Sequence, residues 1–185
     1  FLLINCTSAC DKSIHFGNDY LSYAIGSDGK NIHFTFRPTG KDYLGKNSVS
    51  YCAYIYIAGK EYNASSVSFS GRRMKIEFGG TDITAVIRIK TDRDRITFKV
   101  EDINGNPESL IFLNIPLTLE GMPDEPFAAC VLSMNLFTHI RQLPALQTHL
   151  WATCYSGFYV YDSYRILSLL KEIRYKEKLI MELHK

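Results

Sequence analysis

Apolar and charged side chains alternate at every second position through much of this chain of 185 residues. The clearest example is the run 73–78, Arg-Met-Lys-Ile-Glu-Phe, and the runs 84–90 and 96–101 repeat it. Successive side chains of a β-strand point to opposite faces of the sheet, so this period of two predicts strands with one apolar face and one solvated face. A chain dominated by this pattern is expected to fold mainly into antiparallel sheets.

Turn residues separate the alternating runs at a spacing of about ten residues, which is typical of an antiparallel β-sandwich. Further strands are predicted at 19–25, 31–36, 50–57, 110–119, 127–134 and 146–155. Gly71-Arg72-Arg73 suits the end of a hairpin. Asn104-Gly105 favours a second hairpin turn over a calcium loop. An EF-type loop needs glycine at its sixth position, and here glycine is at the fourth position, counted from Asp102 as the first. The predicted fold class is mainly β, an antiparallel β-sandwich.

The pattern changes toward the C-terminus, where apolar residues recur at helical spacing. They are Ile166, Leu169, Leu170, Ile173, Ile180 and Leu183. Glu172 and Lys176 stand four residues apart, as helix-supporting pairs do. We therefore predict a C-terminal helix over 163–183. The predicted organisation is a remnant of an export signal or a disordered segment at 1–12, a β-sandwich domain at 13–158 and a helical tail at 159–185.

The first ten residues, Phe-Leu-Leu-Ile-Asn-Cys-Thr-Ser-Ala-Cys, resemble the end of an apolar export segment. Ser8-Ala9 before Cys10 resembles a bacterial lipoprotein cleavage site, at which Cys10 would carry the lipid, although Thr7 stands where leucine is usual. The alternative is an unstructured N-terminus or a first strand. The export interpretation predicts a secreted or cell-envelope protein whose contact with a membrane is made only through a lipid anchor.

Composition and motifs argue against several function classes. The formal net charge of +2 provides no general attraction to nucleic acid. The sequence contains no apolar run of about 18 residues, no zinc-type cysteine spacing, no nucleophile motif and no phosphate-binding glycine loop. We therefore assign no catalytic residue, no metal ligand, no cofactor and no nucleic-acid partner. Cys52, Cys130 and Cys154 lie in strand-like runs and are expected to be reduced core residues.

The single tryptophan of the sequence is the centre of a candidate carbohydrate site. If 146–155 is extended, Trp151 shares a strand face with His149 and Tyr155. Aromatic rings pack against the apolar face of a pyranose while nearby polar groups bind its hydroxyls. His139 and Arg141 are the additional polar candidates. The alternative is that Trp151 is a core residue of the sandwich.

Four segments resemble those of a known family. Residues 16–31, Phe-Gly-Asn-Asp-Tyr-Leu-Ser-Tyr-Ala-Ile-Gly-Ser-Asp-Gly-Lys-Asn, resemble the N-[DE]-Y-L strand and D-G turn that open galactose-mutarotase-like supersandwich domains. Thr39-Gly40-Lys41-Asp42-Tyr43 follows where that family has T-G-K-[DE]-Y, and the runs 134–141 and 152–155 are similar to the end of such a domain. In that family the domain stands at the N-terminus of large bacterial glycoside hydrolases, many from gut Bacteroidetes. The resemblance covers residues 14 to 158.

The resemblance implies a non-catalytic accessory domain of a carbohydrate-active protein, which supports a separate catalytic domain or contacts glycan. After Phe158 the sequence departs from the family pattern, so no catalytic residue is carried over. The expected partners are a carbohydrate and a catalytic domain. Two alternatives stay open. One is a stand-alone enzyme of the mutarotase type with His139 or His149 as its base, and the other is a surface-anchored interaction protein without a role in sugar binding.

Overall fold

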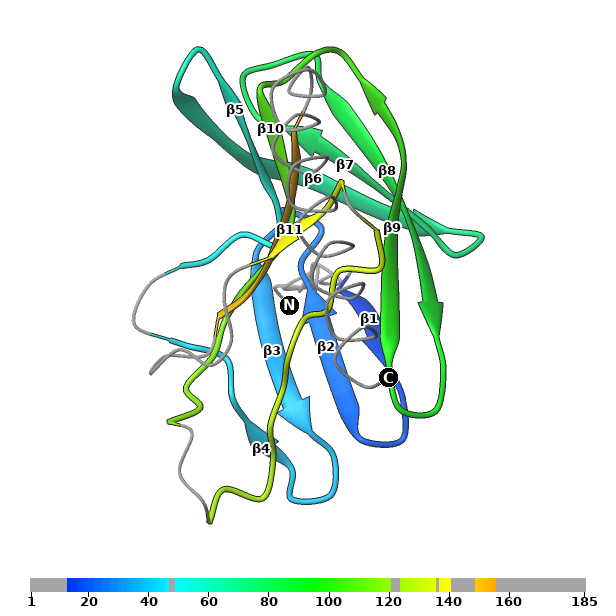
Figure 1. Cartoon of the computed structure of the whole chain (residues 1–185), viewed down its shortest axis with the longest axis vertical. Coiled ribbons are helices and arrows are strands. Elements are labelled where there is room, and N and C mark those ends of the chain that lie inside the picture. Colours follow the sequence, from blue (N-terminus) through cyan, green and yellow to red (C-terminus); the bar gives the residue numbers. More distant parts are fainter. Residues whose placement is uncertain (1–12, 47–48, 121–123, 136, 141–148, 156–185) are drawn as a thin grey trace, which may run out of the picture. The chain divides into compact units, whose positions relative to one another are not determined.

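The computed structural model describes residues 13–46, 49–120, 124–135, 137–140 and 149–155. These residues form antiparallel sheets and contain no helix (Figure 1). The chain divides into two compact units, Phe1–Cys154 and Tyr155–Lys185, and the strands belong to the first apart from the last residue of the final strand. The predicted helix at 163–183 and the predicted segments 1–12 and 159–185 lie outside the described ranges. Within those ranges, no helix has the length and apolarity needed to cross a membrane.

One sheet contains four strands in the order β1-β2-β3-β4. Their bounds are Ile14–Gly17 for β1, Leu21–Ile25 for β2, Asn31–Phe36 for β3 and Lys41–Asp42 for β4. Phe16 lies opposite Tyr23, and Tyr23 lies opposite Phe34. The ring centroids of these neighbours are 6.1 and 5.9 Å apart, and all three rings are buried. An aromatic ladder across three strands thus forms the apolar face of this sheet.

The other sheet has eight strands in the order β11-β12-β10-β5-β6-β7-β8-β9 and curls into a half-barrel (Figure 1). The bounds are Tyr54–Ile57 for β5, Lys60–Ser70 for β6, Arg73–Phe78 for β7, Thr84–Thr91 for β8, Ile96–Asn104 for β9, Ser109–Pro116 for β10, His139–Ile140 for β11 and His149–Tyr155 for β12. The strand predicted at 50–57 is shorter than expected, because Tyr51 forms only an isolated bridge with Lys30.

Two hairpins of this sheet close through two-residue turns. Ala58 and Gly59 join β5 to β6, and Gly71 and Arg72 join β6 to β7. Their φ angles are 49°, 73°, 57° and 65°. Two successive positive φ angles are the mark of a type I′ turn, whose twist matches that of the flanking strands. The hairpin end predicted at Gly71-Arg72-Arg73 is confirmed.

The hairpin predicted at Asn104-Gly105 is wrong. β9 ends at Asn104 and β10 begins at Ser109, but β9 is an edge strand paired with β8, whereas β10 pairs with β5 on the far side of the sheet order. The segment therefore connects two strands that are not neighbours. Gly105 has a φ of +102°, and a Cβ built on it would stand 2.8 Å from Cγ1 of Ile83. Glycine is needed here for a close backbone approach rather than for a hairpin turn.

The strand predicted at 127–134 is also wrong, although its alternation is real. Phe127, Ala129 and Val131 pack against the core, while Leu132 and Met134 are exposed. The segment pairs with no described strand, so it belongs to neither sheet. Cys130 lies in this segment and is exposed, which corrects its assignment as a core residue; Cys52 is buried and Cys154 is half-buried.

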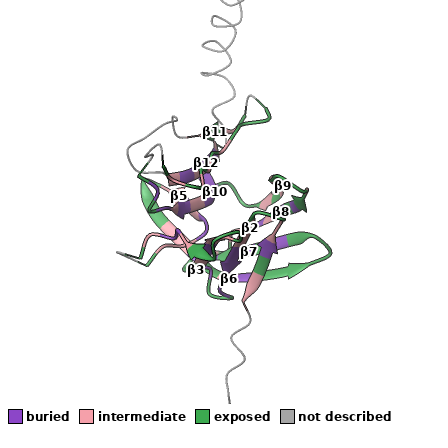
Figure 2. Cartoon of the chain, turned by 90° about the horizontal axis from the view of Figure 1, so that it is seen from below, coloured by how far each residue is buried: buried purple, intermediate pink, exposed green. Residues whose placement is uncertain are grey.

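Side chains from both sheets contribute to one buried cluster, and buried bands alternate with exposed bands along the strands (Figure 2). The Phe16 ring of β1 stands edge-on to Phe69 of β6, with centroids 5.2 Å apart, and 6.4 Å from Phe98 of β9. Full burial of a side chain such as Ile76 contributes about 1.5–3 kcal/mol to folding. Backbone hydrogen bonds join the β2–β3 turn to the larger sheet, including Val67 N to Ser27 O at 2.8 Å.

Candidate functional site

The sequence-predicted carbohydrate residues that the structure describes lie on one face of the larger sheet. His149, Trp151 and Tyr155 occupy alternate positions of β12, so their side chains leave the strand on the same side. His139 of β11 stands opposite Thr153 of β12, and directly opposed residues share a face. These four residues therefore share one face of the sheet. Arg141 and the proposed lipidation site Cys10 lie outside the described residues.

Trp151 is half-buried, and its indole is held by a tyrosine of a distant strand. Its Nε1 donates a hydrogen bond to Oη of Tyr54 on β5, at 3.1 Å. The Tyr54 ring in turn meets Tyr56 edge-on, with centroids 5.8 Å apart and planes at 84°. These three residues, Trp151, Tyr54 and Tyr56, form what we call the aromatic row. Because each ring touches the next, the row presents a connected aromatic surface across the sheet.

The far end of the aromatic row carries a carboxylate. Oη of Tyr56 donates a hydrogen bond to Oε2 of Glu61 at 3.2 Å, across the β5–β6 pair. Partial burial and this carboxylate together raise the pKa of Tyr56 above its ordinary value. Tyr56 therefore stays protonated at neutral pH and keeps its role as a donor.

A chain of amide hydrogen bonds fixes the near end. Nε2 of His149 lies 2.7 Å from Oδ1 of Asn114, whose Nδ2 donates to the carbonyl oxygen of Tyr51 at 2.7 Å. Asn31 Nδ2 donates to the carbonyl oxygen of Asn114 at 2.9 Å. His149 is thereby bonded to an amide of β10, which is connected to β3 of the smaller sheet. This network orients the imidazole ring beside the aromatic row.

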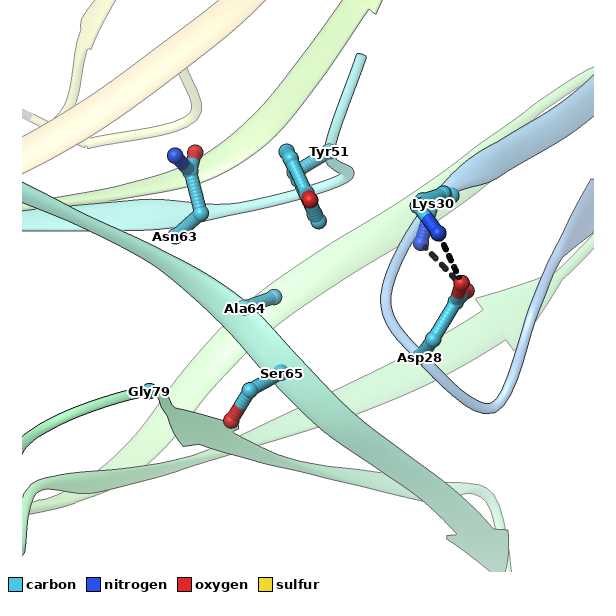
Figure 3. Close-up of a pocket in the computed structure, with 7 residues that line it drawn as sticks. All are labelled: Asp28, Lys30, Tyr51, Asn63, Ala64, Ser65 and Gly79. Carbon is cyan, nitrogen blue, oxygen red and sulfur yellow. Dashed lines mark hydrogen bonds and ion pairs between the residues drawn. The ribbon is translucent and has the colours of Figure 1, made fainter. Parts of the chain in front are cut away.

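Next to the aromatic row, the surface is hollowed by about 370 Å³ (Figure 3). We call this hollow, which is open to solvent, the polar hollow. It is lined by Asp28, Lys30, Tyr51, Asn63, Ala64, Ser65 and Gly79. The space exists because β6 and the residue after β7 present small side chains there. Gly79 leaves this space open because it has no side chain, and a Cβ at that position would stand 3.1 Å from Cβ of Ser65.

The ion pair of Asp28 with Lys30 and the side chain of Asn63 lie at different ends of the polar hollow (Figure 3). Nζ of Lys30 lies 2.6 Å from Oδ2 of Asp28, and both side chains are about half exposed, 44% and 51%. The hydrogen bond from Lys30 is the main cause that lowers the pKa of Asp28, so the carboxylate is ionised at neutral pH. The side-chain amide of Asn63 makes no hydrogen bond to a described residue. The hollow thus offers an anion, a cation, an unused amide and the ring of Tyr51.

The polar hollow and the aromatic row belong to the same face. Asn63 stands opposite Tyr54 in the β5–β6 pair, and directly opposed side chains lie about 4.5–5.5 Å apart on one side of a sheet. Sequence analysis did not single out Tyr54, Tyr56, Asn63 or Tyr51. Tyrosines at alternate positions 54 and 56 were the available indication of a second aromatic strand face.

No protein-family model, no curated protein and no solved structure matches this chain. Its site therefore has to be interpreted from its own geometry. In the described residues, no group of three or more His, Cys, Asp or Glu side chains is arranged to hold a metal ion.

Proposed function

We propose that this chain is a non-catalytic accessory domain of a carbohydrate-active protein, and that it contacts glycan through the polar hollow and the adjoining aromatic row. The observation that carries the proposal is the position of Asn63. Its unpaired amide lies in the hollow and directly opposite Tyr54 of the aromatic row. An amide with free donors and an acceptor, set between aromatic rings, suits a ligand that is apolar on its ring faces and polar at its edge.

Four of the lining residues have a role in binding a pyranose. The ring of Tyr51 provides a flat surface for the C–H face of the sugar. Asn63 both donates and accepts hydrogen bonds with vicinal hydroxyls, and the exposed Asp28–Lys30 pair does the same through one acceptor and one donor. The hollow is open at the surface, which suits one unit of a longer glycan.

The proposal includes a finer description of the fold, a two-sheet sandwich of the galactose-mutarotase-like supersandwich type. The curled eight-stranded sheet and the ring contacts of Phe16 with Phe69 and Phe98 support it. The T-G-K-D-Y motif supports it as well, because Gly40 has a φ of +68° in the β3–β4 turn. The proposal includes export to the cell envelope, with a lipid on Cys10. It also includes a separate catalytic domain as the partner.

The test is a screen of the full chain on arrayed neutral and acidic glycans, followed by affinity measurement for the best ligand. Asn63→Ala removes an amide that has no partner to lose, so we expect a normal fold and an affinity about 2–10-fold weaker, the effect of one hydrogen bond. Tyr51→Ala is expected to reduce affinity further. Asn106→Ala, which removes an exposed amide from the β9–β10 connection, is the matched control and should bind as the wild type does.

Two results would overturn the proposal. Absence of binding to every glycan would favour the surface-anchored interaction protein instead. Conversion of an α-aldose to its anomeric mixture by the isolated chain, with loss of the activity in His149→Ala, would favour a mutarotase-type enzyme.

A further inference from the structure

The cationic side chains of the larger sheet form an ordered row on three neighbouring strands. Arg73 of β7 stands opposite Arg88 of β8, and Arg88 stands opposite Lys99 of β9. Directly opposed residues share a face, so all three side chains project from one side of the sheet. We call these three residues the cationic row. With neighbouring strands about 4.8 Å apart, the row spans about 10 Å across the strands.

The charge of the cationic row is only partly neutralised. Glu101 accepts hydrogen bonds from Nε of both arginines, at 2.7 Å from Arg73 and at a shorter distance from Arg88. Those two bonds lower the pKa of Glu101, which is therefore ionised at neutral pH. Lys99 is exposed and has no ion pair with a described residue. The two arginines thus share one carboxylate, and the row of three cations carries a positive excess.

In the absence of a ligand, this arrangement of like charges lowers the stability of the folded protein. Like charges directly opposite each other in a sheet are destabilising, and one carboxylate offsets only part of that repulsion. The arginine side chains are 55% and 46% exposed. Each uses Nε for Glu101, while the Nη groups make no hydrogen bond to a described residue. The Nη groups are therefore available for the paired contacts that guanidinium groups make with carboxylates and sulfates.

We propose that the cationic row binds an anionic polysaccharide, whose uronate carboxylates or sulfate esters lie across β7, β8 and β9. The class of polymer rests on the proposed glycan-binding function, whereas the cationic surface stands independently of it. The surrounding side chains suit a sugar polymer. Ser68 and Ser70 of β6 share this face through their pairs with Lys75 and Arg73, and they offer hydroxyl groups next to the cations.

A sugar polymer fits this face better than a single-stranded nucleic acid does. Base recognition in single strands relies on aromatic side chains that stack with the bases. No aromatic side chain is among the paired residues that share the face of the cationic row, which include Ser68, Ser70, Lys75, Glu77, Thr84, Val86, Lys90, Thr97 and Asp102. Phe69 and Phe98 belong to the opposite, core-facing side, where they meet Phe16.

The test uses the full chain with four immobilised probes: polygalacturonate, chondroitin sulfate, a neutral β-glucan and single-stranded DNA. Lys99→Gln and Arg73→Gln are compared with Lys46→Gln, which removes the same charge from an exposed site after β4. We expect either acidic polysaccharide to bind, with affinity about 2–5-fold lower in each row variant, as for an exposed charge pair. Binding should also weaken as salt is raised. Lys46→Gln should bind as the wild type does.

The outcomes separate this inference from the proposed function. Retention of polygalacturonate and chondroitin sulfate by both row variants at wild-type affinity would overturn the inference. Binding to the neutral β-glucan without binding to either acidic polymer would overturn it as well, and would leave the proposed function intact. If the same residues bind DNA more tightly than both acidic polysaccharides, the ligand of the cationic row is a nucleic acid and the inference is overturned. Uronate and sulfate ligands are distinguished by which acidic probe binds. Normal urea midpoints for the variants show that any loss is not due to unfolding.

Discussion

Tyr23 donates a hydrogen bond from its buried hydroxyl to Oδ1 of Asn31, at 2.5 Å. Burial is the main cause that raises the pKa of Tyr23 well above its ordinary value, so the hydroxyl remains the donor. Asn31 uses its Nδ2 for Ser50 Oγ at 2.8 Å and for the carbonyl oxygen of Asn114 at 2.9 Å. One tyrosine is thereby connected, through one amide, to the network that orients His149.

Tyr43 provides the matched comparison for Tyr23. It is fully buried, at 0% exposed, yet its hydroxyl has no hydrogen-bond partner among the described residues. We expect Tyr23→Phe to lower the free energy of unfolding by about 1–3 kcal/mol, because it leaves the amide oxygen of Asn31 unpaired. Tyr43→Phe should leave stability unchanged or raise it by up to about 1 kcal/mol, because it removes a buried polar group without a partner. Urea unfolding measures the stability of both variants. Equal losses of stability would contradict the hydrogen bond assigned to Tyr23.

Gly29 lies against the larger sheet in a conformation that other residues rarely adopt. Its φ is +81°, and a Cβ at this position would stand 2.6 Å from Cβ of Ala64. We expect Gly29→Ala to cost roughly 3 kcal/mol or more, since backbone strain and a steric clash add together. Gly40→Ala is the control, because Gly40 has a φ of +68° with nothing within 4 Å. That variant should lose only about 1 kcal/mol. Similar urea midpoints for the two variants would show that the close approach is absent.

Cys52 and Cys130 are expected to differ in reactivity. Burial raises the pKa of the Cys52 thiol to about 12, whereas Cys130 is exposed. Only a thiolate is an effective nucleophile, so iodoacetamide at about pH 8 should modify Cys130 and spare Cys52 in the folded protein. Mass spectrometry of the peptides measures this, and addition of urea should make Cys52 reactive. Rapid alkylation of Cys52 without urea would contradict its placement in the core.

The same thiol makes stability decrease at alkaline pH. The folded chain keeps a proton on Cys52 that the unfolded chain releases above a pH of about 8.5. The stabilisation is therefore complete below that pH and is lost as the pH rises toward 12. Between about pH 8 and pH 10, we expect the urea midpoint of Cys52→Ala to fall less than that of the wild type. Parallel declines would exclude Cys52 as the titrating group.

Asp42 is expected to contribute to acid sensitivity. Burial alone would raise its pKa, but backbone hydrogen bonds from Phe34 and Leu44 and the ammonium of Lys46 outweigh burial and lower it. The stabilisation is therefore present above a pH of about 4 and is lost as the pH falls through the lowered pKa. Asp42→Asn should lose less stability than the wild type between about pH 6 and pH 3. Asp82→Asn, on the exposed β7–β8 turn, controls for removal of a surface charge. An equally reduced loss of stability in Asp82→Asn between about pH 6 and pH 3 would contradict a specific role for Asp42.

The sequence predicts individual strands of this fold better than it predicts their neighbours. Alternation identifies β7, whose residues are exposed and buried in strict turn, and β3, whose bounds are those expected. It does not show that β10 lies between β5 and β12, because pairing between distant segments leaves no periodic pattern. The segment 127–134 fails for the same reason. Its side chains alternate as in a strand, but it pairs with no described strand.

The candidate site is likewise predictable from the sequence only in part. The shared face of His149, Trp151 and Tyr155 follows from the period of two along one strand. The contact between Trp151 and Tyr54 joins residues 97 positions apart, and no local pattern indicates it. The polar hollow depends on the small size of Ala64 and Gly79 where two strands meet. A hollow made by small side chains cannot be predicted from the sequence, because it depends on which strands meet in the folded chain.

The late position of β10 along the chain has a consequence for biosynthesis. β10 pairs with β5, and the residues that follow it bond to the smaller sheet through Thr118 N and Tyr43 O. A nascent polypeptide whose residues 109–118 are still inside the ribosome leaves an edge of β5 unprotected, open to pairing with another chain. Because these contacts join residues far apart in sequence, the last steps of folding are expected to be slow. Emergence of β10 from the ribosome, rather than emergence of the first hairpins, is then the step that protects this edge of β5 from aggregation.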